Sequence, residues 1–130
     1  MRRALLGAFI TFALVTAMPL VAHHSSTMFD TSKVVTFEGV VTKWELTNPH
    51  SWLHVEVKGK DGKTVVWGFE AEGPSTLARS GIKPSDFKVG TKLTISGNPM
   101  RDGQPAAIWL DAVRTSDGKK FNPRAGFAVK

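Results

Sequence analysis

The sequence predicts a mostly β fold, a small five-stranded barrel with one short helix between strands 3 and 4. Three observations predict this fold. Five segments have the alternation or the β-branched and aromatic content of strands with one buried face. Clusters of Gly, Asp, Asn and Pro separate these segments and indicate turns. One segment between the third and fourth strands has the start and stop signals of a helix instead.

The first predicted strand lies within residues 33–46, which are rich in β-branched and aromatic residues. Gly39 interrupts this segment, and a Gly inside a strand marks a bulge or a sharp bend. Such a bend allows one long strand to serve two sides of a barrel. Thr47-Asn48-Pro49 is expected to end the strand, because Asn-Pro favours a turn.

The second and third strands are expected to form a hairpin. Residues 51–57 alternate, with Val55 and its odd-numbered neighbours on one face and Trp52 and its even-numbered neighbours on the other. Asp61-Gly62 is a strong hairpin signal. Residues 64–70 follow as the third strand, with Trp67 and Phe69 on the same face.

Residues 73–81 predict a helix of about two turns, because Pro74 stands at a favoured first position and Gly81 just past the end. Strands are expected over 91–96 and 106–115, and Phe121 is expected to pair briefly after a final turn. In the last long strand, residues 106–115, the even-numbered positions are predicted to face inward.

The predicted core comprises the inward apolar residues of each element, namely Val35, Phe37, Val41, Leu53, Val55, Val57, Val65, Trp67, Phe69, Leu77, Leu93, Ile95, Ile108 and Leu110.

Five strands with a helix between the third and fourth is the order of the OB-fold, a partly open five-stranded barrel. The alternative is a β-sandwich, for which about seven strands are needed. We find no internal repeat and no second domain. The sequence therefore divides into an N-terminal arm over residues 23–32, an OB-like barrel over 33–121 and a loose tail over 122–130.

Residues 1–22 have the parts of a secretory signal peptide. Arg2 and Arg3 form the basic start, residues 4–17 are almost entirely apolar, and Ala22 is the small residue at the cut. A membrane anchor is the alternative, since the 19 residues from 4 to 22 approach the length of a span, but Pro19 favours cleavage. We expect a periplasmic or secreted protein of 108 residues with no stable membrane insertion after cleavage.

Composition narrows the possible functions. The absence of Cys excludes disulfides, thiolate metal sites and cysteine nucleophiles. Removal of residues 1–22 leaves 15 basic and 11 acidic side chains, and this mild net charge of +4, with export, argues against nucleic acid as a partner. No acid, base and nucleophile form a recognisable set, so an enzyme is not expected; a copper-dependent oxidase is a minor alternative.

Five groups of residues form distinctive motifs, namely Ala22-His23-His24-Ser25, Met28-Phe29-Asp30, Thr47-Asn48-Pro49-His50-Ser51-Trp52, Trp67-Gly68-Phe69-Glu70 and Gly97-Asn98-Pro99 with Arg101-Asp102-Gly103. Together they resemble the motifs of DUF6152, a domain-of-unknown-function family of small exported bacterial proteins. The resemblance covers nearly the whole mature chain, to about Gly118. It implies export and a small barrel, and it implies no established activity. The chain departs from the family pattern at Ile82, where a Trp is expected.

All four histidines lie in two places. His23 and His24 would begin the mature chain, and His50 and His54 flank Trp52. An N-terminal His can chelate a metal through its amine and its ring, a donor set that suits Cu(II), with Zn and Ni following. We therefore predict a metal site drawn from these histidines, with one copper ion favoured and His50 the preferred further ligand of the His23 chelate.

Other side chains extend this hypothesis or compete with it. Met28 and Met100 are thioethers that would add affinity for Cu(I). The alternative function is a non-metal binding module for a small ligand or an envelope protein, in which Trp52 stacks on its ligand. On this alternative the histidines are polar surface or turn residues, and the tryptophans in general fill the barrel. The sequence identifies no protein partner.

We predict cleavage between Ala22 and His23. The physical basis is the basic start, the apolar run and the small residue at the cut. The intact mass of the exported protein measures this directly and should correspond to residues 23–130. A membrane-bound species that retains residues 1–22 would contradict the prediction and indicate an anchor.

Overall fold

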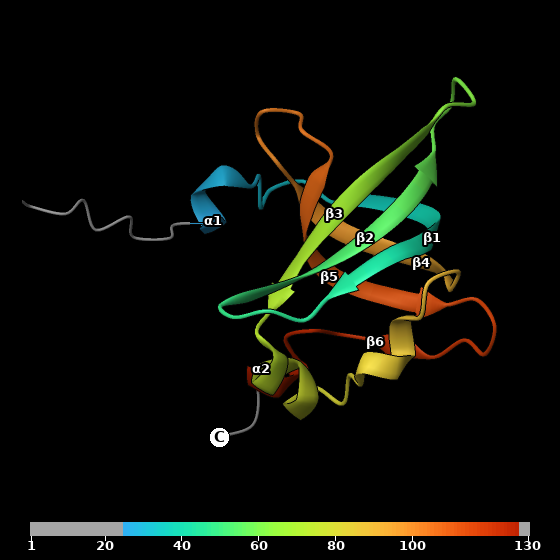
Figure 1. The fold of residues 1–130 in the computed structure, drawn as a ribbon. Coiled ribbons are helices and arrows are strands. Elements are labelled where there is room, and N and C mark those ends of the chain that lie inside the picture. Colours follow the sequence, from blue (N-terminus) through green and yellow to red (C-terminus); the bar gives the residue numbers. More distant parts are fainter. Residues whose placement is uncertain (1–24, 128–130) are drawn as a thin grey trace, which may run out of the picture.

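Five strands enclose one apolar core in the computed structural model, which describes residues 25–127 (Figure 1). The five barrel strands are β1 (Val35–Glu45), β2 (His50–Lys58), β3 (Thr64–Glu72), β4 (Lys92–Pro99) and β5 (Ala106–Arg114), and a short sixth strand, β6 (Lys120–Phe121), pairs with β5. The helices are α1 (Ser25–Met28), α2 (Pro74–Arg79), η1 (Pro84–Phe87) and η2 (Ala125–Phe127). The proposed signal peptide lies outside the described residues. Within them, no helix is long and apolar enough to cross a membrane.

The strands pair in the order β3-β2-β1-β4-β5-β6, and an additional pairing of β3 with β5 closes the barrel. This closing pair is parallel and joins Gly68 to Ala106 and Glu70 to Ile108. All the other strand pairs are antiparallel. The structure thus confirms the predicted five-stranded barrel with a short helix, α2, between the third and fourth strands, and Phe121 pairs with β5 as expected.

Gly39 lies where the long β1 strand pairs on both sides. It stands opposite Val57 of β2 and Leu93 of β4. A Cβ at this position would lie 2.5 Å from Cγ1 of Val55 and 2.6 Å from the carbonyl oxygen of Glu56, so only Gly allows the strands to approach this closely. The irregularity in pairing itself comes slightly later, between Val41 and Lys43.

Most of the predicted core residues are buried. Val65 is an exception, since 45% of its surface is exposed. Its strand β3 meets β5 only from Gly68 onward, and the preceding residues extend into the β2–β3 hairpin, which projects away from the barrel (Figure 1). Val35, Phe37 and Trp67 pack at the edge of the core and are partly buried. Ile82, which departs from the family pattern, is a buried member of the core.

The predicted inward face of β5 is confirmed at Ile108 and Ala112, which are buried, and is wrong at Leu110. Leu110 is partly exposed, whereas its neighbour Trp109 is fully buried. The reason is a bulge: Ser96 of β4 pairs with Asp111, but its neighbour Gly97 pairs with Trp109, and Leu110 has no partner in the ladder. One extra residue shifts the alternation by one position, so the strand turns different residues inward on the two sides of the bulge.

Aromatic side chains fill the centre of the barrel. The ring of Trp109 meets those of Trp44 and Phe87 edge to face, at centroid distances of 6.1 and 5.3 Å. Phe121 lies against Phe87 at 4.7 Å. Together with Trp67, which packs at the edge of the core, three of the four tryptophans therefore contribute buried apolar area, as the sequence predicted for most of them.

The chain after β6 is packed rather than loose. Pro123 is buried, and its carbonyl oxygen accepts a hydrogen bond from Oγ of Ser80 at 3.0 Å. The same Oγ accepts a hydrogen bond from the backbone N–H of Gly126 at 2.8 Å. Ser80 follows α2, so residues 122–127 are held against that helix, and the prediction of a loose tail is wrong over this range.

A buried carboxylate joins η1 to β5. Oδ1 of Asp86 accepts hydrogen bonds from Arg114 at 3.2 Å and from Lys119 at 3.0 Å, and Oδ2 accepts one from the backbone N–H of Lys83 at 2.8 Å. Burial raises the pKa of Asp86, but these hydrogen bonds outweigh burial and hold its pKa below the ordinary value. Arg114 also donates to Asp117 and is the main cause that lowers the pKa of Asp117 to about 2.

We expect Trp109→Ala to lower the free energy of unfolding by about 3–5 kcal/mol, because it empties the centre of the core. Leu110→Ala is the matched control and should cost clearly less, since Leu110 lies at the bulge and is partly exposed. Urea unfolding of both variants measures the difference. Equal losses would show that the bulge does not set the inward face of β5.

We expect Asp86→Asn to be less stable than the parent at pH 7. The carboxylate has a pKa below 3.8 in the folded state, so its contribution is complete above pH 3.8 and is lost as the pH falls through the folded pKa. The gap in melting temperature between parent and variant should therefore shrink on acidification below pH 3.8. Asp111→Asn, an exposed change beside Ser96, should follow the parent at every pH. A constant gap for Asp86→Asn would contradict this account.

Candidate functional site

A pocket of about 330 Å³ lies where the N-terminal arm crosses the face of β2 and β3. We call it the arm pocket. Its wall combines two thioethers, two aromatic rings, an imidazole, a carboxylate and a proline, supplied by Met28, Phe29, Pro49, His50, Trp52, Glu70 and Met100. On an OB-fold the β2–β3 face and the loops after β1 and β4 form the usual ligand-binding surface.

Backbone contacts hold the arm in place beside the loop after β4 (Figure 1). Phe29 forms an isolated antiparallel bridge with Met100, and the N–H of Arg101 donates to the carbonyl oxygen of Met28 at 2.9 Å. The Phe29 side chain is only 2% exposed. Within the arm, Ser25–Met28 form one helical turn, α1. This anchoring brings Met28 and Met100 to the same pocket.

His50 and Glu70 form the polar part of the pocket. Nδ1 of His50 lies 2.8 Å from Oε1 of Glu70, joining the first residue of β2 to β3. Glu70 is 7% exposed, and a buried carboxylate requires a partner of this kind. Nε2 of His50 has no hydrogen bond within the described part of the chain. The pair therefore fixes the ring and leaves one nitrogen for a ligand.

Trp52 lies two residues after His50, on the same outward face of β2. A Cβ on Gly68 of β3 would lie 3.3 Å from Cε3 of Trp52, so the six-membered ring extends over that glycine. A larger side chain at position 68 would push against the ring. Trp52 is partly buried and lines the arm pocket beside His50.

His54 does not join His50 in the pocket. Its Nε2 lies 2.8 Å from Oε2 of Glu45, whose other oxygen pairs with Lys43. Hydrogen bonding to Lys43, and then to His54, lowers the pKa of Glu45. Between residues 25 and 127, no three His, Asp or Glu side chains are grouped so that they would hold a metal ion.

The residues singled out from the sequence are thus divided. The structure brings together Met28, His50, Trp52 and Met100, and it directs His54 to a separate surface pair. The predicted ligands His23 and His24 lie outside the described residues.

Glu70 is the charged residue of the arm pocket that the sequence analysis did not connect to the site. In the sequence it stands out only as the last residue of the Trp67-Gly68-Phe69-Glu70 motif. The hairpin at Asp61-Gly62 is the feature that could have connected Glu70 to the site, because the register of this hairpin places Trp52 opposite Glu70. Residues opposite each other in an antiparallel pair share a face, so the alternation of both strands would have put this carboxylate beside the imidazole.

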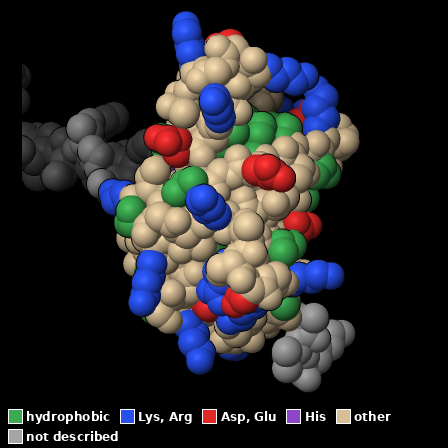
Figure 2. All heavy atoms as spheres, turned by 90° about the vertical axis from the view of Figure 1, so that its right-hand side faces the viewer, with side chains coloured by type: hydrophobic (Ala, Val, Ile, Leu, Met, Phe, Trp, Pro, Cys, Tyr) green, Lys and Arg blue, Asp and Glu red, His purple; other side chains and the backbone are tan. Residues whose placement is uncertain are grey.

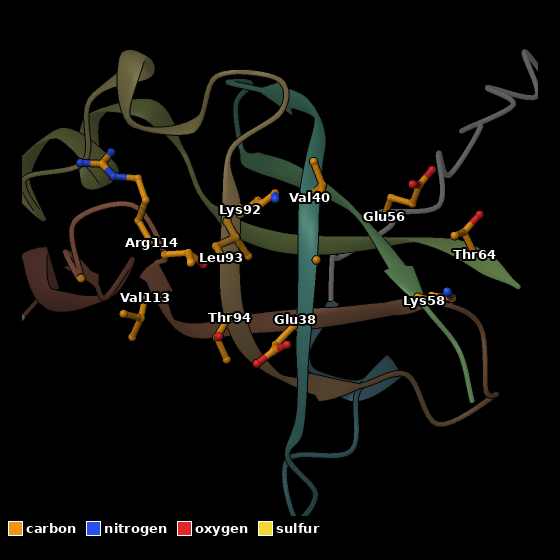
Figure 3. A pocket seen from close by; sticks show the side chains of 13 residues that line it. Glu38, Val40, Glu56, Lys58, Thr64, Lys92, Leu93, Thr94, Val113 and Arg114 are labelled. Carbon is orange, nitrogen blue, oxygen red and sulfur yellow. The ribbon is translucent and has the colours of Figure 1, made fainter. Parts of the chain in front are cut away.

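A second, larger cavity of about 620 Å³ crosses the outer face of β1, β2, β4 and β5. It shares no residue with the arm pocket, and its wall has neither an imidazole nor a thioether. Figure 3 shows the charged ends of Glu56, Lys58 and Arg114 spread around the groove rather than directed at one point. Figure 2 shows one face of the molecule, where small hydrophobic groups are separated by Lys, Arg, Asp and Glu side chains. This arrangement offers no convergent set of ligands.

In a comparison with known proteins, the model of a family of unknown function, DUF6152, matches residues 12–109 and confirms the resemblance indicated by the motifs. No curated protein and no solved structure matches the chain.

Proposed function

Because the chain belongs to the family DUF6152, whose function is unknown, we propose a function from its own residues: it is an exported protein that binds one copper ion at the arm pocket. The observation that carries the proposal is that one imidazole and two thioethers line this pocket, close to the N-terminal end of the described chain. The compartment we propose is the periplasm or the outside of the cell.

The His50–Glu70 pair supports a metal ligand at His50. A metal-bound imidazole usually donates its second ring N–H to a carboxylate or carbonyl, which orients the ring and raises its basicity. Glu70 is in that position, 2.8 Å from Nδ1, and Nε2 is left to bind an ion. Glu70 is mostly buried, and a positive ion beside His50 would further compensate its charge.

His23 is within reach of the same pocket. It precedes Met28 by five residues, so chain length alone keeps the two α-carbons within about 18 Å. After cleavage behind Ala22, the α-amine and the ring of His23 form a chelate on a single residue. We propose that this chelate and His50 hold Cu(II), with His24 as a further nitrogen donor available at the terminus.

Copper is favoured by the kind of donors. Nitrogen sites bind divalent copper more tightly than zinc or nickel, and thioethers select copper over the harder metals. The one carboxylate of the pocket is already paired with the one imidazole, so we propose a binding role rather than a catalytic one.

A second candidate is a module that binds a small organic ligand. The supporting observation is the Trp52 ring, which extends over Gly68 on the β2–β3 face. Aromatic rings on this face of an OB-fold are used to stack on bases or sugars, and Trp52 is only partly buried there. Binding of such a ligand with no bound metal would favour this candidate.

We expect that one added Gly before His23 weakens Cu(II) binding by about tenfold or more, because the amine no longer chelates with the His23 ring. His50→Ala should weaken binding less and change the copper spectrum. His54→Ala is the matched control and should bind like the parent, since its imidazole pairs with Glu45 outside the pocket. Calorimetry on processed protein measures these affinities.

Metal binding displaces protons from the amine and the imidazoles, so the affinity should also fall as the pH drops below neutral. Unchanged Cu(II) affinity in the Gly-extended protein would exclude the N-terminal chelate. Parent protein that binds copper no better than an unrelated His-containing domain would exclude the metal function and leave the organic-ligand module.

A further inference from the structure

We infer that the arm pocket is a site for monovalent copper, in which Met28, Met100 and His50 bind the ion and the Trp52 ring covers it. The inference rests on the proposed function only for the pocket and for His50. It adds the oxidation state of the ion and three residues that the N-terminal chelate does not use.

The two methionines are placed as a pair. They are the only methionines after residue 22, and they come from segments more than seventy residues apart. The Phe29–Met100 bridge and the Arg101–Met28 backbone hydrogen bond set these segments side by side in a defined register. Both side chains line the same pocket, so the tertiary structure brings the two thioethers to one place.

Packing alone does not account for Met28. A methionine that fills a gap in a core is buried, whereas Met28 is 53% exposed at the rim of a pocket. Its neighbour Phe29, 2% exposed, anchors the arm. The exposed position leaves the Met28 residue open to solvent.

The donor set matches a soft monovalent ion. Two thioethers and a neutral imidazole carry no charge, and thioether sulfur selects Cu(I). Glu70, behind His50, supplies one negative charge near the ion without being needed as a ligand. Zinc prefers a set of imidazoles, thiolates and carboxylates, and no group of three His, Asp or Glu is present in residues 25–127.

Trp52 completes the site. It lines the pocket next to His50, and its ring is held along the sheet over Gly68. A cation close to an indole face is attracted by the ring quadrupole, and this attraction is stronger when the cation has lost water. An ion bound here therefore changes the surroundings of one specific tryptophan, which makes Trp52 a built-in reporter.

The test uses processed protein that begins at His23. Cu(I) is titrated without oxygen against a colorimetric Cu(I) chelator, and Ag(I) serves as a redox-inert probe of the same site. Met28→Leu and Met100→Leu conserve volume and should each weaken Cu(I) binding by about tenfold or more, with a smaller effect on Cu(II). Ag(I) should change tryptophan fluorescence in the parent, and Trp52→Phe should remove most of this change.

Two further variants distinguish the orienting of the His50 imidazole by Glu70 from a general loss of structure. Glu70→Gln should weaken Cu(I) binding by about 10–100-fold while the fold is kept, because Glu70 orients the imidazole. His54→Ala should leave Cu(I) binding unchanged. X-ray absorption of the Cu(I)-loaded parent is independent of any variant and should show sulfur scatterers together with nitrogen.

The possible results distinguish this inference from the proposed function. The inference is overturned if Cu(I) affinity is unchanged by both methionine substitutions, or if X-ray absorption shows no sulfur scatterer around the copper. In that case the effect of the added Gly on Cu(II) affinity still tests the N-terminal chelate separately. Methionine-dependent Cu(I) binding with no effect of the added Gly supports the pocket site and excludes the chelate. No binding of either ion by the parent overturns both.

Discussion

The parallel pairing of β3 with β5 is the constraint on which the rest of the barrel and its site depend. Only three residue pairs form it, from Gly68–Ala106 to Glu70–Ile108, with one further hydrogen bond from the N–H of Gly68 to the carbonyl oxygen of Pro105. These pairs turn an open sheet into a closed barrel. They also bring the loop after β4 to the β2–β3 face, because Met100 donates a backbone hydrogen bond to the carbonyl oxygen of Ala106 at the start of β5.

Close approach of the strands makes this small barrel possible without disulfides. At Gly97 an added Cβ would lie 2.5 Å from the carbonyl oxygen of Ile108 and 2.8 Å from Cβ of Ala107. This glycine adjoins the bulge that turns Trp109 into the core. A single backbone feature thus determines both how tightly β4 and β5 pack and which aromatic ring fills the centre of the barrel.

The arm pocket combines parts that differ in rigidity. His50, Trp52 and Glu70 belong to paired strands, and the close contact of the His50 imidazole with the Glu70 carboxylate, 2.8 Å from Nδ1 to Oε1, restrains two of them further. Met28 belongs to an arm that is fixed by one buried ring and a few backbone hydrogen bonds. Segments with few buried contacts open more readily than paired strands. The arm is therefore the part of the pocket wall that opens most readily, whereas the strands stay paired.

The sequence alone determined the architecture of this protein and a large part of its candidate site. Strand alternation, the Asp61-Gly62 turn and the Pro74 to Gly81 helix signals are local patterns, and local patterns specify which segments become strands or helices. The chemistry of the side chains, imidazole, thioether and indole, singled out Met28, His50, Trp52 and Met100 as residues able to bind a ligand.

Tertiary structure alone decided which of these residues meet. The bulge at Leu110 and the folding of residues 122–127 onto Ser80 depend on contacts between segments far apart in the chain. The same holds for the separation of His54, paired with Glu45, from His50, paired with Glu70. The hydrophobic periodicity and the composition of a sequence describe each segment by itself, whereas a binding site requires side chains from several segments at one point. Barrel closure and the anchoring of the arm bring them there.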